Sequence, residues 1–121
     1  MSSMQSSIEH LAAQHEAECD PEARKIFLAF RDALTRGKIR AAEKIGDKWT
    51  VNAWVKRGIL LGFRLGELAE TGSGDGLSFV DKDTFPARKF SVADRVRVVP
   101  GGSSVRMGAY VAPSEIGRAH V

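Results

Sequence analysis

The segment VRVVPGGSSVRMGAYVAP, residues 96–113, carries an unusual spacing of aliphatic residues. Val99, Val105 and Val111 recur every six residues, which fits neither the period of two of a strand nor the period of 3.6 of a helix. Aliphatic residues at this spacing are typical of a solenoid, in which the chain turns a corner after each short strand. Three valines at a fixed spacing also occur in an ordinary sheet, so the spacing alone leaves both architectures open.

The residues at the start of the chain predict two helices. Apolar residues at helical spacing indicate an amphipathic helix over about residues 5–18. A second helix is expected from about residue 20 to residue 36, with Asp20 as its N-cap and Gly37 as its C-cap. Both helices would bury one apolar face.

A hairpin and a third helix are expected next. The sequence IRAAEKIGDKWTV, residues 39–51, predicts two short strands on either side of a turn at Gly46. The sequence AWVKRGILLGFRL, residues 53–65, predicts a helix that is buried on several sides. Gly58 and Gly62 lie four residues apart, where they would let a neighbouring backbone approach closely.

Composition limits the classes of protein that fit. One domain plus a short further piece is the most that 121 residues can hold. The net charge of +3 selects no partner. A single cysteine, Cys19, excludes an internal disulfide and a multi-cysteine metal site. The start of the chain lacks the pattern of a signal peptide, and no apolar run approaches the roughly 20 residues of a membrane span. We therefore expect a cytoplasmic protein that contacts no membrane.

The composition changes after the third helix. Residues 69–90, AETGSGDGLSFVDKDTFPARKF, are rich in glycine and lack regular apolar spacing, which predicts a linker over residues 69–95. The closely spaced glycines 72, 74 and 76 form no dinucleotide-binding fingerprint, because no strand precedes them.

Three blocks of this sequence resemble the tetrahydrodipicolinate N-succinyltransferase family. VRVVP followed by small residues and VRMGAYVAP resembles the entry into that family's left-handed β-helix. IRAAEKIGDKWTVNAWVKRGILLGFRL, residues 39–65, resembles its N-terminal domain, and FVDKDTFPARKF, residues 79–90, resembles its aromatic-Asp-Lys linker. The resemblance covers roughly residues 41–113.

The resemblance implies an α+β fold in three parts. Residues 1–68 would form an N-terminal helical domain with a β-hairpin, residues 69–95 a linker, and residues 96–113 the first coil of a truncated left-handed parallel β-helix. It also implies an acyltransferase of lysine and diaminopimelate biosynthesis, which transfers succinyl from succinyl-CoA to the amine of tetrahydrodipicolinate. The intact protein would be a homotrimer without a bound cofactor or metal.

The resemblance also points to site residues. Arg97, in VRVVP, matches the family's substrate-binding arginine, and Arg106 is a second candidate. Guanidinium groups suit an acceptor with two carboxylates because their planar fork makes paired hydrogen bonds. Either arginine is otherwise a solvated surface charge. No catalytic residue is expected within the chain, since the family's general base and CoA pocket belong to later coils.

The last seven residues, EIGRAHV, have a different interpretation. The family would place an aliphatic residue at position 117, where this chain has Gly117. One reading frame of a common short-read sequencing adapter encodes the same seven residues. We therefore expect residues 115–121 to be an artefact that carries no structural or functional weight, which removes Arg118 and His120 as ligands. The chain as written is expected to be inactive and to form no stable trimer.

Other features have simple structural interpretations. The loop over residues 100–104 lacks the Lys of a phosphate-binding loop and is expected to be a flexible corner. Cys19 has no activating neighbour, so an inert thiol is expected. Trp49 and Trp54 are expected to pack between the hairpin and the third helix, with a stacking platform for a nucleotide as the alternative.

A second functional class is a small basic module that binds nucleic acid. It would use the basic residues Arg36, Lys38, Arg40, Lys44, Lys48, Lys56 and Arg57. Acidic residues interleave with these charges, and no nucleic-acid-binding motif is present. The sequence therefore favours the enzyme and no nucleic-acid partner.

Overall fold

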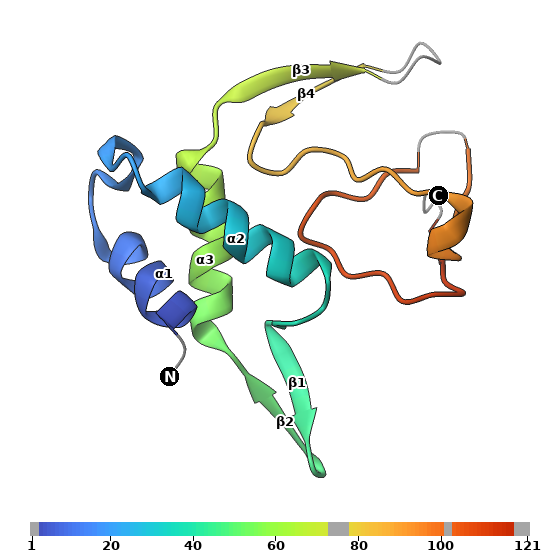
Figure 1. Cartoon of the computed structure of the whole chain (residues 1–121), viewed down its shortest axis with the longest axis horizontal. Coiled ribbons are helices and arrows are strands. Elements are labelled where there is room, and N and C mark those ends of the chain that lie inside the picture. The colour runs from blue at the N-terminus through green and yellow to red at the C-terminus, as the bar shows by residue number, and fades with distance from the viewer. Residues whose placement is uncertain (1–2, 73–77, 101–102, 118–121) are drawn as a thin grey trace.

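A computed structural model describes residues 3–72, 78–100 and 103–117, and three helices form its centre (Figure 1). The elements are α1 (Ser3–Ala13), η1 (Ala17–Cys19), α2 (Ala23–Thr35), β1 (Ala42–Ile45), β2 (Lys48–Val51), α3 (Ala53–Leu65), β3 (Leu68–Gly72), β4 (Ser78–Lys82), η2 (Val92–Asp94), β5 (Arg97–Val98) and β6 (Ile116–Gly117). In Figure 1, the hairpin of β1 and β2 projects from one end of the helices, the hairpin of β3 and β4 lies at the opposite end, and the extended C-terminal segment lies beside the helices.

The ends of the first two helices follow local capping chemistry. α1 ends at Ala13, earlier than the sequence predicts, and the separate 3₁₀ turn η1 takes up the residues up to Cys19. α2 begins at Ala23 with Glu22 as its N-cap, so the predicted N-cap at Asp20 is wrong. The Asp20 carboxylate accepts a hydrogen bond from the backbone N–H of Glu22 at 2.9 Å, in the turn before the helix. Gly37 has φ +74° and follows the last turn of α2. The predicted glycine C-cap is therefore confirmed.

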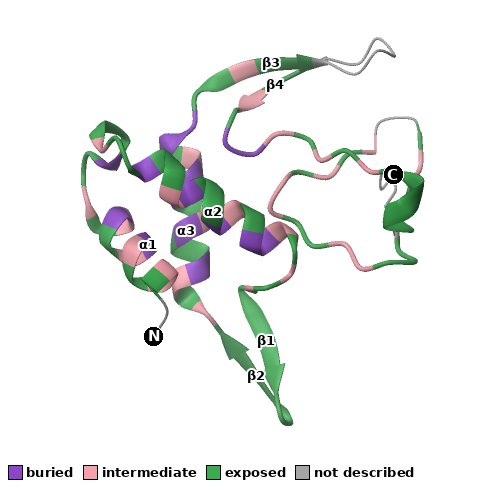
Figure 2. Ribbon diagram, viewed as in Figure 1, coloured by how far each residue is buried: buried purple, intermediate pink, exposed green. Residues whose placement is uncertain are grey.

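The core lies where α2 crosses α3, and Figure 2 shows its buried residues on the facing sides of the helices. Phe27 and Phe30 of α2 are fully buried. They lie directly over Gly58 and Gly62 of α3, where an added Cβ would approach a phenylalanine Cζ to 2.4 Å. A close approach at the two glycines is present, but phenylalanine rings make it and not the backbone that the sequence predicts. Only glycine allows this contact without a shift of the packed rings.

The first hairpin is confirmed but packs differently from the prediction. β1 and β2 pair antiparallel around the turn at Gly46, and every residue of both strands is exposed. Trp54 packs against Phe30, with ring centroids 5.9 Å apart, whereas Trp49 is 72% exposed. The packing prediction for Trp49 is therefore wrong, because the hairpin extends past the helices and no described element covers it (Figure 1).

The predicted linker contains a second hairpin and a part of the core. β3 and β4 pair antiparallel, with Leu68 opposite Lys82. Beyond β4, Thr84 is fully buried and Phe85 is 5% exposed. The Thr84 hydroxyl donates to the carbonyl of Gly62 at 2.7 Å, and the same carbonyl accepts from the backbone N–H of Gly66 at 3.0 Å. Thr84 and Phe85 thus attach the second hairpin to the helices. The division of the chain into domains stays a prediction.

The C-terminal segment is extended where it is described. Residues 99, 100 and 103–111 contain no helix, and the three periodic valines are half-buried. Val105 and Val111 line one cavity together with Val96 and Val98, whereas Val99 does not line it. This part of the chain is therefore a curved extended segment with valines on its inner side, and no β-helix coil is formed within the described residues.

The segment closes on itself through a short parallel pair. β5 pairs with β6, with Arg97 opposite Ile116 and Val98 opposite Gly117. This pairing satisfies backbone groups of β5. Residues 118–121 lie outside the described part, and the origin of this ending stays a prediction.

Candidate functional site

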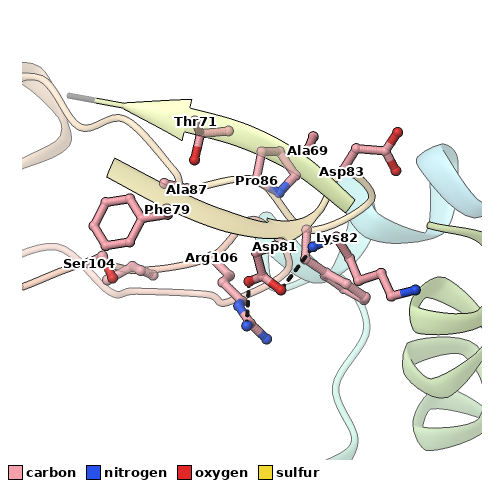
Figure 3. Close-up of a pocket in the computed structure, with 12 residues that line it drawn as sticks. Ala69, Thr71, Phe79, Asp81, Lys82, Asp83, Pro86, Ala87, Ser104 and Arg106 are labelled. Carbon is pink, nitrogen blue, oxygen red and sulfur yellow. Dashed lines mark hydrogen bonds and ion pairs between the residues drawn. The ribbon is translucent and has the colours of Figure 1, made fainter. Parts of the chain in front are cut away.

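A pocket of about 280 Å³ lies between the second hairpin and the segment around Arg106 (Figure 3). Its walls combine apolar side chains with one ion pair, the composition expected of a small-molecule site. Figure 3 shows Asp81 and Arg106 pointing toward each other at its edge. The apolar lining comes from Ala69, Phe79, Phe85, Pro86, Ala87 and Val105, and the polar lining from Thr71, Asp81, Lys82, Asp83, Ser104 and Arg106.

Arg106 is held by several contacts. Its Nη2 lies 2.5 Å from Oδ2 of Asp81, and its guanidinium lies 5.5 Å from the ring centre of Phe63. Asp81 is itself fixed, because its Oδ1 accepts a hydrogen bond from the backbone N–H of Lys82 at 2.8 Å. The guanidinium of Arg106 is thus already occupied by a carboxylate of the protein.

The residues that follow Arg106 dock onto the C-terminal end of α2. The backbone N–H of Gly108 donates to Oγ1 of Thr35 at 2.7 Å. The ring of Tyr110 lies against Gly37, where an added Cβ would come within 2.8 Å of Tyr110 Cδ1. The Arg40 guanidinium lies 5.0 Å from the centre of the same ring. The RMGAY motif therefore has a packing role that joins the extended segment to the helices.

Arg97 occupies a different surface. Its backbone N–H donates to the carbonyl of Glu115 at 3.0 Å, and its side chain is exposed. Within the described residues, its guanidinium makes no hydrogen bond or ion pair. Arg97 lines a shallow hollow that also includes Arg95, whereas Arg106 lines the pocket beside the second hairpin. The structure does not bring the two predicted substrate-binding arginines together, and their roles stay predictions.

Two shifted pKa values belong to groups with structural contacts. Burial lowers the pKa of Arg31, whose Nη1 donates to the carbonyl of Thr84 at 2.9 Å. A hydrogen bond from the backbone N–H of Glu67 lowers the pKa of Asp83, and the ion pair of Asp83 with Arg24 acts in the same direction. These groups fasten α2 to the start and end of the second hairpin.

No group of three or more His, Cys, Asp or Glu side chains within the described ranges could hold a metal ion. Cys19 is a free, exposed thiol. None of the helices in the described part of the chain has the length and apolar character needed to cross a bilayer.

Sequence reasoning missed three residues that shape this region. Asp81 orients Arg106, Phe85 joins the core, and Thr35 anchors Gly108. The first two fall in the predicted linker, where the apolar residues between polar neighbours were the available signal for a strand. Thr35 ends an apolar helix face, and its partner is 73 residues away, so no local pattern could identify it.

Comparisons with known proteins agree on one family. The family profile described as "Tetrahydrodipicolinate N-succinyltransferase N-terminal" matches residues 3–65. A relative from Methylorubrum extorquens (strain PA1) is 40% identical over 89 residues, which are 69% of this chain and 31% of the relative. One from Paramagnetospirillum magneticum (strain ATCC 700264 / AMB-1) is 39% identical over 101 residues, which are 78% of this chain and 35% of the relative.

A third relative aligns with almost the whole chain. The protein from Nitrosococcus oceani (strain ATCC 19707) is 36% identical over 128 aligned positions, which cover 96% of this chain and 45% of the relative. All three relatives are named 2,3,4,5-tetrahydropyridine-2,6-dicarboxylate N-succinyltransferase. The chain thus spans between about a third and just under half of the length of these relatives.

Proposed function

The chain belongs to the tetrahydrodipicolinate N-succinyltransferase family, and from this premise we propose that it supplies the N-terminal part of an enzyme that transfers a succinyl group. The donor would be succinyl-CoA, and the acceptor would be the amine of ring-opened tetrahydrodipicolinate in lysine and diaminopimelate biosynthesis. The name shared by the relatives is the observation that carries this proposal. The cytoplasm would be the place of the reaction, and no cofactor would be bound.

The proposal extends to the architecture beyond the helices. We take residues 96–113 as the start of a left-handed parallel β-helix, in a protein that assembles as a homotrimer. One feature of the structure supports this solenoid. Val96, Val98, Val105 and Val111 line the inside of the turn that this segment makes. Inward-facing aliphatic residues of successive short strands form the core of a solenoid.

Arg97 is the better candidate of the two arginines for binding the acceptor. Its guanidinium is exposed and has no partner in the described part of the chain, so it can pair with a substrate carboxylate at no cost to an existing bond. Arg106 would first have to leave Asp81. We therefore assign Arg97 to one carboxylate of the acceptor and give Arg106 a secondary role in the pocket of Figure 3.

A chimeric enzyme tests the proposed function. Residues 1–113 of this chain would replace the matching part of the Nitrosococcus oceani relative, and release of CoA from succinyl-CoA would be followed with and without the acceptor. We expect turnover that requires both substrates, because the grafted part provides the acceptor site. The 121-residue chain alone should show none.

The control for the chimera is the unmodified relative, assayed in parallel. A chimera that folds, assembles like the relative and fails to turn over would refute the proposal. Turnover that does not depend on the acceptor would refute it as well.

A further inference from the structure

Two arginines flank Val96 at the start of β5. Val96 is half-buried and lines the cavity inside the turn of the C-terminal segment. Arg95 and Arg97 are exposed, and both line one shallow hollow on the outer surface. The remaining lining residues of this hollow are Val92, Val96, Ser114 and Glu115. Two exposed arginines therefore line one concave surface.

Neither guanidinium is neutralised within the described residues. The adjacent acid, Asp94, is already engaged, because its Oδ2 accepts hydrogen bonds from the backbone N–H of Ser91 at 2.7 Å and from the Ser91 hydroxyl at 3.3 Å. Glu115 lies in the same hollow but forms no ion pair with either arginine in the described part of the chain. The hollow thus presents two cationic groups that are available to an anion.

Arg95 has a backbone conformation that is unusual for a residue with a long side chain. Arg95 has φ 57° and ψ 35°, a left-handed conformation in which glycine is more favourable than arginine. The backbone is fixed there, since its N–H donates to the carbonyl of Val92 at 3.1 Å and its carbonyl accepts from Ser114 N–H at 2.6 Å. Local structure alone therefore favours glycine, and the long cationic side chain needs another explanation.

We propose that Arg95 and Arg97 form a binding site for a dicarboxylate, in which Arg95 selects for the second carboxylate. This inference rests on the proposed function and adds a specificity residue to it. Each guanidinium presents a planar fork to a carboxylate, so two forks in one hollow favour a ligand with two carboxylates over a ligand with one. Arg97 alone would bind both kinds of ligand equally well.

The test is a binding titration of the whole 121-residue chain, followed by NMR of its ¹⁵N-labelled backbone at low ionic strength. The probes are pimelate, a seven-carbon dicarboxylate, and heptanoate, the corresponding monocarboxylate. We expect pimelate to bind at least about threefold more tightly, with shift changes at Arg95, Arg97 and Glu115. Equal affinity for the two probes would overturn the proposal.

Two variants locate the selectivity. Arg95→Gly should weaken pimelate binding by about threefold to tenfold and leave heptanoate binding within about twofold. Its melting temperature should be unchanged or higher, because glycine suits the left-handed backbone. Arg97→Ala should weaken the binding of both probes, since each probe offers one carboxylate to Arg97.

A matched control measures the effect of net charge alone. Lys25→Ala removes one positive charge from an exposed position on α2 and should leave both affinities unchanged. The proposal fails if Lys25→Ala weakens pimelate binding as much as Arg95→Gly does. It also fails if Arg95→Gly lowers the melting temperature together with the affinity, because that pattern indicates a structural role.

The outcome is separable from that of the proposed function. A chimera without turnover beside a chain that still prefers pimelate would refute the succinyltransferase and leave the dicarboxylate site standing. An active chimera whose acceptor KM is unchanged by Arg95→Gly would refute the role of Arg95 and leave the succinyltransferase standing.

Discussion

Replacing Gly62 by alanine tests the packing that holds α2, α3 and the second hairpin together. The new Cβ would lie 2.4 Å from Cζ of Phe27 and 2.7 Å from Cε2 of Phe85. Ordinary carbon–carbon contacts are about 3.5–4.0 Å, so the helices must separate by about 1 Å or the rings must turn. Phe27 cannot turn freely, because it is fully buried between Phe30 and Phe85 at centroid distances of 6.0 and 5.4 Å.

The magnitude follows from two opposing effects. Overpacking a core costs about 1–3 kcal/mol, and the higher helix propensity of alanine returns about 1 kcal/mol. Two rings are pressed at once, so we expect a net loss of about 1–2 kcal/mol in the free energy of unfolding. This corresponds to a melting temperature roughly 3–12 °C lower for a domain of this size.

Thermal and urea unfolding followed by circular dichroism would measure the effect. Leu60→Ala provides a control on α3 at a residue that is 54% exposed, and it should change the free energy of unfolding by less than about 0.5 kcal/mol. Phe27→Leu should cost less in the Gly62→Ala background than in the wild-type chain, since the smaller side chain relieves the contact. A Gly62→Ala variant as stable as the wild type would refute this account of the core.

Three further changes have defined outcomes. Thr35→Val removes the acceptor for Gly108 N–H and should lower the free energy of unfolding by about 0.5–1.5 kcal/mol. Hydrogen exchange at Gly108 should become faster, and unchanged exchange would contradict the role of this hydrogen bond. The hydrogen bond from Glu67 N–H and the charge of Arg24 lower the pKa of Asp83, so the Asp83 carboxylate stabilises the fold above pH 3.8 and loses this effect as the pH falls further. Asp83→Asn should therefore reduce the loss of stability on acidification. An unchanged dependence of stability on pH would argue against this role of Asp83. Trp49→Ala should change the free energy of unfolding by less than about 0.5 kcal/mol, because Trp49 is exposed. A larger loss in urea unfolding would indicate that Trp49 packs against the helix, as the sequence predicts.

Local patterns predicted the helical part of the fold well. The third helix has the predicted bounds, Ala53–Leu65, because Asn52 and Gly66 limit it on either side of a continuous apolar run. Gly37 ends the second helix as its position after Arg36 indicates. These features depend on residues within one turn of each other, and such information is present in the sequence.

The remaining features depend on contacts between distant residues. Phe85 is buried because Gly62 leaves space for its ring, and Arg106 is oriented by Asp81. Trp49 is exposed because its hairpin extends beyond the helices, although its side chain is typical of a packed strand. Arg95 was not singled out, since its left-handed backbone is imposed by bonds to Val92 and Ser114. The spacing of apolar residues along the sequence predicts none of these long-range contacts.

The most direct test of the proposed enzyme is the kinetic effect of Arg97→Ala in the chimera with the Nitrosococcus oceani relative. Loss of one charge-assisted hydrogen bond should cost about 1.5–3 kcal/mol, which raises the KM of the acceptor by roughly tenfold to a hundredfold. The KM of succinyl-CoA should stay within about twofold of its value in the unmutated chimera. Equal increases in both KM values, or no change in either, would contradict the assignment of Arg97 to the acceptor.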